Sequence, residues 1–193
     1  MTLAPWRPSL ARALHRNRSR PYSRYLQLAT LRPDGRPANR TVVFRGFMQD
    51  SNTLTLITDV RSEKVSHLAH QPWAEACWYF TETREQFRLT GTLQLIDANS
   101  QKAALQIARQ QTWESLSDAA RIQFTWPASG QPRAAQDAFE APAPHPSLPL
   151  ESFCLLLLLP TEVDHLELRG NPQTRTHHRI TDLEQWVVEP INP

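Results

Sequence analysis

The sequence predicts a mainly β domain in which antiparallel strands close into a barrel and the helices are insertions. Two observations predict this class. Short strand-like segments follow one another through hairpin turns, and the helix-like segments do not alternate regularly with them. A doubly wound parallel sheet needs such alternation, so the pattern argues against it. The chain of 193 residues has the length of a single domain, which we place at 1–193, and its 40% of hydrophobic residues can form a core.

The N-terminal segment is rich in arginine. Residues 1–33 contain seven arginines and no acidic residue. This composition would suit an organelle transit peptide or an arm that binds phosphate. It also suits a helix over 8–19, with Ser9 as N-cap and an apolar face that includes Leu10 and Leu14. The helix is the interpretation that we favour, and the other two stay open.

The first half of the chain predicts a series of hairpins and one helix. At 33–37, the turn PDGRP has a proline that presets φ and a glycine that supplies a positive φ. A helix is expected at 62–71, with Ser62 as N-cap and Pro72 after its end. The strands predicted in this half cover 24–32, 38–47, 53–59, 74–83 and 85–96.

The second half begins with a helical insertion at 100–124, expected to be two helices broken near Thr112. Residues 127–149 contain six prolines and predict a loop. The run FCLLLLLP at 153–160 is shorter than the roughly 20 residues that span a bilayer, so it predicts a strand buried on both faces. Further strand-like segments cover 162–170, 175–181 and 184–191.

Charge and cysteine content limit the partners and the compartment. A net charge of +2 gives no overall field that would favour nucleic acid. Cys77 and Cys154 lie in apolar, strand-like segments and form no CxxC motif, so we expect them to be buried and reduced. Such thiols are consistent with a cytoplasmic protein, and no segment predicts a membrane partner.

Several kinds of site lack a motif in this sequence. There is no Gly-rich phosphate loop, neither GxGxxG nor GxxxxGK[ST], and no GxSxG nucleophile elbow. His177 and His178 are adjacent on a predicted strand, where neighbouring side chains point to opposite faces. They are therefore poorly placed to bind one metal ion, and we predict no metal site.

An anion site is predicted where the strand at 53–59 runs into the following helix. Lys64 would lie in the first helical turn, where a positive charge is unfavourable. An anion shared by Thr58, Ser62 and Lys64 would remove that penalty. The alternative is that Lys64 merely pairs with Glu63 or faces solvent.

A second pair of cations flanks the TVVF segment. Arg40 and Arg45 are five residues apart, so on a regular strand they would face opposite sides.

Three segments occur in an order and spacing that resemble a known family: NRTVVFRGF, LTLITDVRSEKVSHL and QPWAEACWYFTETREQFRLTG. They resemble the pyridoxamine 5'-phosphate oxidase superfamily of FMN-binding split barrels. The segment Trp126–Pro132 and the ending VDHLELRGNPQ are more similar to its cyanobacterial and plant Alr4036-type branch. The resemblance covers residues 8–190. It implies an antiparallel Greek-key split barrel, a homodimer, FMN across the dimer interface, and a small-molecule substrate such as a phosphorylated vitamin B6 vitamer.

The resemblance also assigns roles to residues. The implied anion is the FMN phosphate, neutralised by Arg40 and Lys64 through charge-assisted bonds. The implied substrate contacts are Arg45, Arg175 and His177. The implied FMN contacts are Arg40, Thr41, Val42, Val43, Phe44, Arg45, Ile57, Thr58, Ser62, Lys64, Gln86 and Arg179.

The chain departs from the family pattern at three places. Glu63 stands where the oxidases commonly carry a second basic residue, so it must point away from a phosphate or pair with Arg61. Arg45 replaces a more usual lysine. The segment 112–132 lacks a clean match to the Tyr, Arg and Ser that hold the substrate phosphate in true oxidases. FMN binding therefore carries over better than the oxidase reaction does.

Three functions follow from these observations. The first is a flavoprotein oxidoreductase of the pyridoxamine 5'-phosphate oxidase type. The second is an FMN-dependent reductase of another small molecule that uses a nicotinamide donor. The third is a protein without catalysis that stores flavin or uses its arginine-rich N-terminus on nucleic acid.

Overall fold

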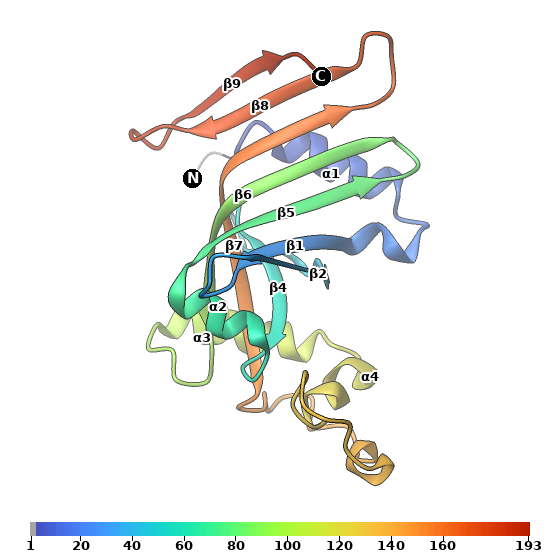
Figure 1. Ribbon diagram of the computed structural model, residues 1–193, viewed down its shortest axis with the longest axis vertical. Helices are drawn as coiled ribbons and strands as arrows, with labels where there is room; N and C mark the ends of the chain where they lie inside the picture. The colour runs from blue at the N-terminus through green and yellow to red at the C-terminus, as the bar shows by residue number, and fades with distance from the viewer. Residues whose placement is uncertain (1–2) are drawn as a thin grey trace.

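The computed structural model describes residues 3–193, and within them the strands form one curled sheet in which every pairing is antiparallel (Figure 1). The strand order is β2-β1-β5-β6-β7-β4-β3, and β8 joins β7 to β9. The predicted fold class is confirmed. The strands are β1 Tyr25–Leu31, β2 Pro37–Val43, β3 Gly46–Phe47, β4 Leu54–Asp59, β5 Trp73–Phe80, β6 Glu85–Ile96, β7 Phe153–Glu167, β8 Thr174–Ile180 and β9 Trp186–Ile191.

The helices pack around this sheet. They are α1 Arg7–Arg16, α2 Glu63–His70, α3 Ala103–Glu114 and α4 Asp118–Arg121, with 3-10 turns at Pro21–Arg24, Ile122–Phe124 and Gln136–Phe139. Helix α1 begins at Arg7, so the prediction of Ser9 as N-cap was wrong. Pro8 sits in the first turn, where its fixed φ and missing N–H are tolerated. The insertion breaks after Glu114, slightly later than the predicted break near Thr112.

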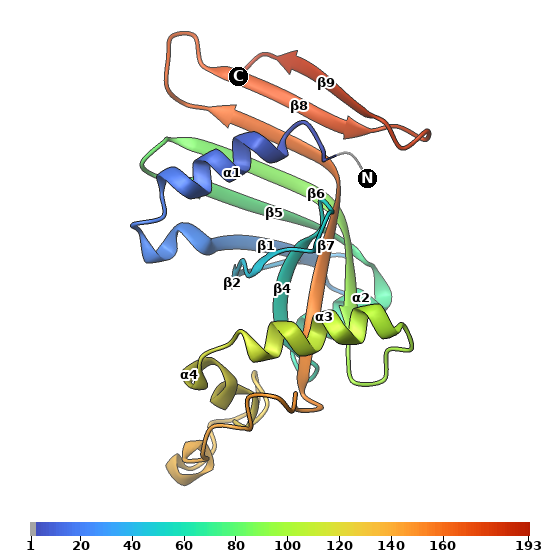
Figure 2. The ribbon, with the colours of Figure 1, turned by 180° about the vertical axis from the view of Figure 1, so that it is seen from behind.

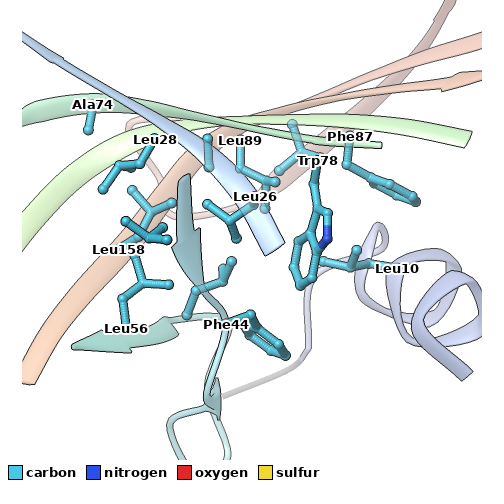
Figure 3. Packing of buried hydrophobic residues seen from close by; sticks show 14 of the residues in the cluster. Leu10, Leu26, Leu28, Phe44, Leu56, Ala74, Trp78, Phe87, Leu89 and Leu158 are labelled. Atoms are coloured by element: carbon cyan, nitrogen blue, oxygen red, sulfur yellow. The ribbon is translucent and has the colours of Figure 1, made fainter. Parts of the chain in front are cut away.

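The main core fills the concave side of the sheet, where α1 packs across β5 and β6 (Figure 2). Along β5 and β6 buried residues alternate with more exposed ones, as expected for strands with one face in the core. Figure 3 shows Leu10 of α1 beside Trp78, and Leu26 belongs to the same cluster. Each such large apolar side chain contributes about 1.5–3 kcal/mol when it is fully buried.

Strand β7 is a single strand of 15 residues, whereas the sequence predicted two. Its first six residues are buried, which confirms the expectation for most of the apolar run, but Leu159 is exposed. Leu156 and Leu158 pack into the main core, and Leu155 and Leu157 pack on the opposite face beneath α3.

A β-bulge divides the β6–β7 ladder into two halves. The register shifts between Thr90 and Gly91, which lie opposite Glu162 and Pro160. Pro160 has no N–H to donate, and the bulge accommodates it. The two strands approach so closely here that a Cβ on Gly91 would overlap the carbonyl of Leu159. One half of the ladder faces β4 and α3, and the other half faces β8 (Figure 1).

The cysteines and the helices bear on two further expectations. Both thiols are free; Cys154 is buried as expected, but Cys77 is partly exposed because it lies on the outer face of β5. Among the helices within residues 3–193, none has both the length and the apolar character needed to cross a membrane.

Candidate functional site

A cavity of about 640 Å³ lies where β2 and β4 end, between these strands and the segment that follows α4. In Figure 1 that segment, drawn in gold, lies beside the end of β4. Nine of the residues predicted to contact FMN line this one cavity, although they come from three separate elements. They are Arg40, Thr41, Val42, Val43, Arg45, Ile57, Thr58, Ser62 and Lys64.

The turn between β4 and α2 places the hydroxyl and ammonium groups. The Asp59 carboxylate accepts a hydrogen bond from the backbone N–H of Arg61 at 2.8 Å and binds its guanidinium at 2.6 Å. Ser62 is the N-cap of α2, as predicted, but its hydroxyl makes no capping bond to the helix. That hydroxyl instead accepts a hydrogen bond from Lys64 Nζ at 2.6 Å, and Thr58 Oγ1 accepts another at 2.9 Å. Lys64 therefore turns back over the strand end, and the alternative of pairing with Glu63 or solvent was wrong.

Arg40 is held to the barrel wall by the strand beside it. Its Nη1 atom donates to the Thr30 hydroxyl at 2.7 Å and to the carbonyls of Ala38 and Leu28 at 2.9 and 3.1 Å. The Thr30 hydroxyl in turn lies 2.9 Å from Nδ1 of His67 on α2. These bonds fix one nitrogen of the guanidinium, and no carboxylate takes part in them.

Burial lowers the pKa values of three cations in this cavity, Arg40, Arg45 and Lys64. It lowers the pKa of Lys64, and the nearby charge of Arg40 lowers that pKa further. It also lowers the pKa values of Arg40 and Arg45. An anion placed between such cations would stabilise their charged forms, because each would gain a partner that it lacks in the protein alone.

The charge of the cavity is unbalanced. Its lining holds four cationic side chains and one carboxylate, Asp59, which is already bound to Arg61. Arg45 Nε is buried without a hydrogen-bond partner among the described residues. The donor set of guanidinium, ammonium and hydroxyl groups fits a phosphate, and the apolar side chains of Val42, Val43 and Ile57 could pack on a flavin.

The chain leaves the strand geometry after Val43. Phe44 turns into the main core, where it is 5% exposed and packs against Trp78 (Figure 3). Only its backbone is available to a cofactor, so its side chain is not part of the cavity. Arg45 N–H then bonds to the Thr55 carbonyl at 2.8 Å. Because the strand is not regular here, Arg40 and Arg45 line the same cavity, and the prediction that they face opposite sides was wrong.

Glu63 points away from the cavity. Its carboxylate lies 3.6 Å from Arg32 and 3.4 Å from the ring of His67. The alternative partner considered for it, Arg61, is bound to Asp59.

Besides Phe44, four predicted site residues lie outside the cavity. Gln86 is on β6 opposite Tyr79, and the other three are on β8 at the far end of the molecule (Figure 1). Arg175 is bound to Asp164 at 2.6 Å, His177 lies 3.7 Å from Glu162, and Arg179 lies 3.5 Å from Glu189. Within one copy of the chain, these residues do not meet the cavity residues.

The two adjacent histidines face opposite sides of β8, as the sequence predicted. His178 is buried, and burial lowers its pKa, whereas His177 is partly exposed. In the described part of the chain, no cluster of three or more His, Cys, Asp or Glu residues could hold a metal ion.

Sequence reasoning missed the far wall of the cavity. The segment after α4 contributes Phe124, Trp126, Arg133 and Phe139 to the lining. A signal was present, because aromatic residues within a proline-rich loop need a surface on which to pack. The sequence alone did not indicate which surface that would be.

Comparison with known proteins identifies the family. Residues 3–97 match the model of the pyridoxamine 5'-phosphate oxidase FMN-binding domain. The chain is 38% identical to the Arabidopsis thaliana pyridoxine/pyridoxamine 5'-phosphate oxidase 2, over 99% of this chain and 98% of the relative. The chain belongs to the pyridoxamine 5'-phosphate oxidase-like family. Binding of FMN is shown by the same two matches.

Two further members of the pyridoxamine 5'-phosphate oxidase-like family are informative. A crystal structure from Nostoc punctiforme, described as a pyridoxamine 5'-phosphate oxidase-related, FMN binding protein, superposes with a TM-score of 0.97; it is 57% identical, and the alignment covers 100% of both chains. A dihydrophenazinedicarboxylate synthase from Pseudomonas chlororaphis is 30% identical over 88% of this chain and 75% of its own length. Members of this family thus carry names for different reactions.

Proposed function

We propose that this protein is an FMN-dependent oxidoreductase of the pyridoxamine 5'-phosphate oxidase type. The observation that carries the proposal is the cavity, in which neither Arg40 nor Lys64 is bound to a carboxylate. A relative that aligns with 99% of this chain is named as such an oxidase. Its substrate is a small molecule, and a phosphorylated vitamin B6 vitamer is the one we favour. When bound, FMN would supply the redox chemistry, in which the substrate would lose a hydride and oxygen would take up the electrons.

The residues of the chain bind and orient in this proposal. Arg40 and Lys64 bind the FMN phosphate, assisted by the hydroxyls of Thr58 and Ser62. Backbone groups of 42–44 would offer hydrogen-bond donors and acceptors to the flavin. Arg45 follows the end of β2 and lines the same cavity, where its guanidinium can bind the anionic group of a substrate.

We propose that the working unit is a homodimer. Gln86, Arg175, His177 and Arg179 lie outside the cavity of their own chain, and a second copy could bring them to it. Support comes from large aromatic side chains exposed on β5: Tyr79, opposite Gln86, is 43% exposed, and Trp73, at the other end of the strand, is 45% exposed. Sedimentation with and without FMN measures this. A monomer that binds FMN as tightly as any larger species would contradict the dimer.

A second candidate function is reduction of another small molecule with a nicotinamide donor. Arg121, in the segment where an oxidase would hold the substrate phosphate, is buried and donates to the carbonyls of Trp113 and Leu116 and to the carboxylate of Asp118. It is therefore not free to bind a phosphate. The relative named dihydrophenazinedicarboxylate synthase also indicates that the family includes other substrates.

The candidate without catalysis is less well supported by the N-terminal arginines. Arg20 is bound to Glu82 at 2.6 Å, and Arg12 and Arg16 line a small cavity together with Glu82, Glu85 and Glu167. Carboxylates thus lie beside part of the positive charge that nucleic acid would need.

Two free thiols support our placing the protein in the cytoplasm.

The deciding experiment is an anaerobic absorption measurement on the protein loaded with FMN. Pyridoxine 5'-phosphate or pyridoxamine 5'-phosphate is added, and bleaching of the flavin spectrum is the expected result. A spectrum that stays oxidised with both compounds, but bleaches with a reduced nicotinamide, would replace the oxidase by the reductase. A spectrum that bleaches with neither class of reductant would favour flavin storage.

A further inference from the structure

The far wall of the cavity contains a cation that no motif assigns. Arg133 lies in the segment between α4 and β7, and it lines the same cavity as Arg40 and Lys64. We infer that Arg133 is a third ligand of the FMN phosphate, brought to the phosphate from across the cavity by the segment 126–139.

The segment is attached to the barrel at the phosphate end of the cavity. The carbonyl of Phe124 accepts hydrogen bonds from Ser152 Oγ at 2.9 Å and from Arg61 Nη2 at 3.3 Å. Arg61 belongs to the turn that positions Ser62 and Lys64. The chain therefore enters 126–139 next to the turn that carries Ser62 and Lys64, and 126–134 line the same cavity as these two residues. Figure 1 shows this segment, drawn in gold, beside the end of β4.

An aromatic platform holds the guanidinium of Arg133. Its central carbon lies 4.2 Å from the ring centre of Phe139, within the range of a cation–π contact. The Phe139 ring in turn packs edge-on against Trp126, with ring centres 5.9 Å apart. All three side chains line the cavity, so the segment presents Arg133 on a built surface and not on a free loop.

Arg133 has no anionic partner in the described part of the chain. Its one polar side-chain contact is with the amide oxygen of Gln136 at 3.4 Å. A guanidinium has five N–H donors in a fork that matches phosphate, and most of those of Arg133 are unused. Asp59, the carboxylate in the lining, is already bound by Arg61. Arg133 is exposed to solvent, so these donors are open to an external anion that enters the cavity.

The position of Arg133 also explains how the cavity can do without a positive charge at residue 63. Glu63 replaces a basic side chain at the start of α2 and turns toward Arg32 and His67. The charge missing from α2 is supplied by Arg133 from the opposite wall, so the cavity keeps three cations around the phosphate.

The test compares two flavins that differ in the phosphate. The full-length apoprotein is titrated with FMN and, separately, with riboflavin, and binding is followed by quenching of flavin fluorescence. Arg133→Gln should weaken FMN binding about tenfold and leave riboflavin binding unchanged, because the lost contact is a charged hydrogen bond to phosphate. Arg133→Lys should recover part of the loss, since it restores the charge but not the planar fork.

Two further variants make the result decisive. Arg36→Gln is the matched control, because Arg36 is an exposed arginine bound to Asp34 and lies outside the cavity lining. It should change neither titration. Phe139→Leu removes the platform and should weaken FMN binding in the same sense as Arg133→Gln, but less.

Two outcomes would overturn the inference while leaving FMN binding itself intact. The first is an Arg133→Gln protein with wild-type FMN affinity, in a series where Lys64→Ala shows a loss. The second is an equal loss for FMN and riboflavin, which would place Arg133 at the ring or at the ribityl chain.

Discussion

The two halves of the β6–β7 ladder use the same residue types in opposite ways. Beside the β4 half, Arg40 and Lys64 lie in a cavity where neither is bound to a carboxylate, and burial lowers their pKa values. Beside the β8 half, Arg88 is bound to Glu75 at 2.9 Å and Arg175 to Asp164 at 2.6 Å. Those carboxylates raise the pKa values of both arginines.

This difference shows which cations lack a negatively charged partner within the single chain. On the β8 face the protein provides the negative charge itself, so these arginines are satisfied in the single chain. In the cavity the negative charge must come with a ligand, since buried cations without partners are unfavourable. An arginine that is bound to a carboxylate can still bind a substrate, but the substrate then shares the guanidinium with that carboxylate.

The largest expected effect comes from disturbing the boundary between the two halves. Gly91→Ala places a Cβ against the backbone carbonyl of Leu159. The clash is with backbone atoms, so neither strand can move aside at low energetic cost. We expect a loss of unfolding free energy of about 3 kcal/mol or more. Urea denaturation measures it, with Gln94→Ala on the same strand as control. A stable Gly91→Ala protein would mean that the bulge can move.

The next effect concerns the cavity cations. Lys64→Ala should weaken FMN binding by about 10- to 100-fold, because a phosphate loses a charged donor. Arg40→Ala should act in the same direction. Fluorescence titration measures both, with the exposed Lys102→Ala as the matched control. Glu63→Arg should tighten binding or leave it unchanged. If Lys64→Ala and Arg40→Ala retain wild-type affinity, the phosphate lies elsewhere.

The lowered pKa of Lys64 gives FMN binding a pH dependence. Burial and Arg40 lower that pKa from its ordinary value of 10.5, so in the apoprotein the ammonium loses its proton at a lower pH than a free lysine does. FMN affinity should be full above about pH 6, where the phosphate carries its second charge, and should fall as the pH rises through the lowered pKa. Lys64→Arg should flatten the alkaline fall, because a guanidinium stays charged. Equal alkaline profiles would exclude Lys64 as the titrating group.

The sequence predicted the fold well where the signals are local. Hairpin turns and alternation placed β1, β2, β4, β5 and β6, since turn chemistry and side-chain period are properties of a few neighbouring residues. The short strand β3 was not predicted, because 38–47 was expected to be one strand. The sequence missed the continuity of β7, because Pro160 is normally a strand end and is tolerated here only by a bulge with a distant strand. It missed the end of β2 for a related reason: Phe44 turns into a core that forms from remote residues.

The candidate site divides in the same way. Thr58, Ser62 and Lys64 lie close in the sequence, so their convergence on one cavity could be anticipated from a strand followed by a helix. The far wall depends on contacts between residues far apart in the chain, such as the Phe124 carbonyl with Arg61 and Ser152. Whether an arginine on a strand is paired depends on register, which fixes Arg175 beside Asp164 through the β7–β8 pairing.

The smallest expected effect tests the paired side of the comparison. Asp164→Asn removes the carboxylate from Arg175, and we expect a loss of about 1 kcal/mol of unfolding free energy at pH 7, since the pair is partly exposed. The hydrogen bond from Arg175 holds the pKa of Asp164 below its usual range. Its contribution is therefore present above the unfolded-state pKa and is lost as the pH falls through the folded-state pKa.

The difference in stability between the wild type and Asp164→Asn should accordingly shrink in acid. Denaturation at pH 7 and at pH 3 measures it, and a difference that stays constant would show that packing, not charge, is what the substitution removes. FMN affinity should be unchanged in this variant, because Asp164 lies outside the cavity lining. If FMN affinity rises with the loss of Asp164, then Arg175 contacts the cofactor of a second copy and the carboxylate competes with the phosphate for it.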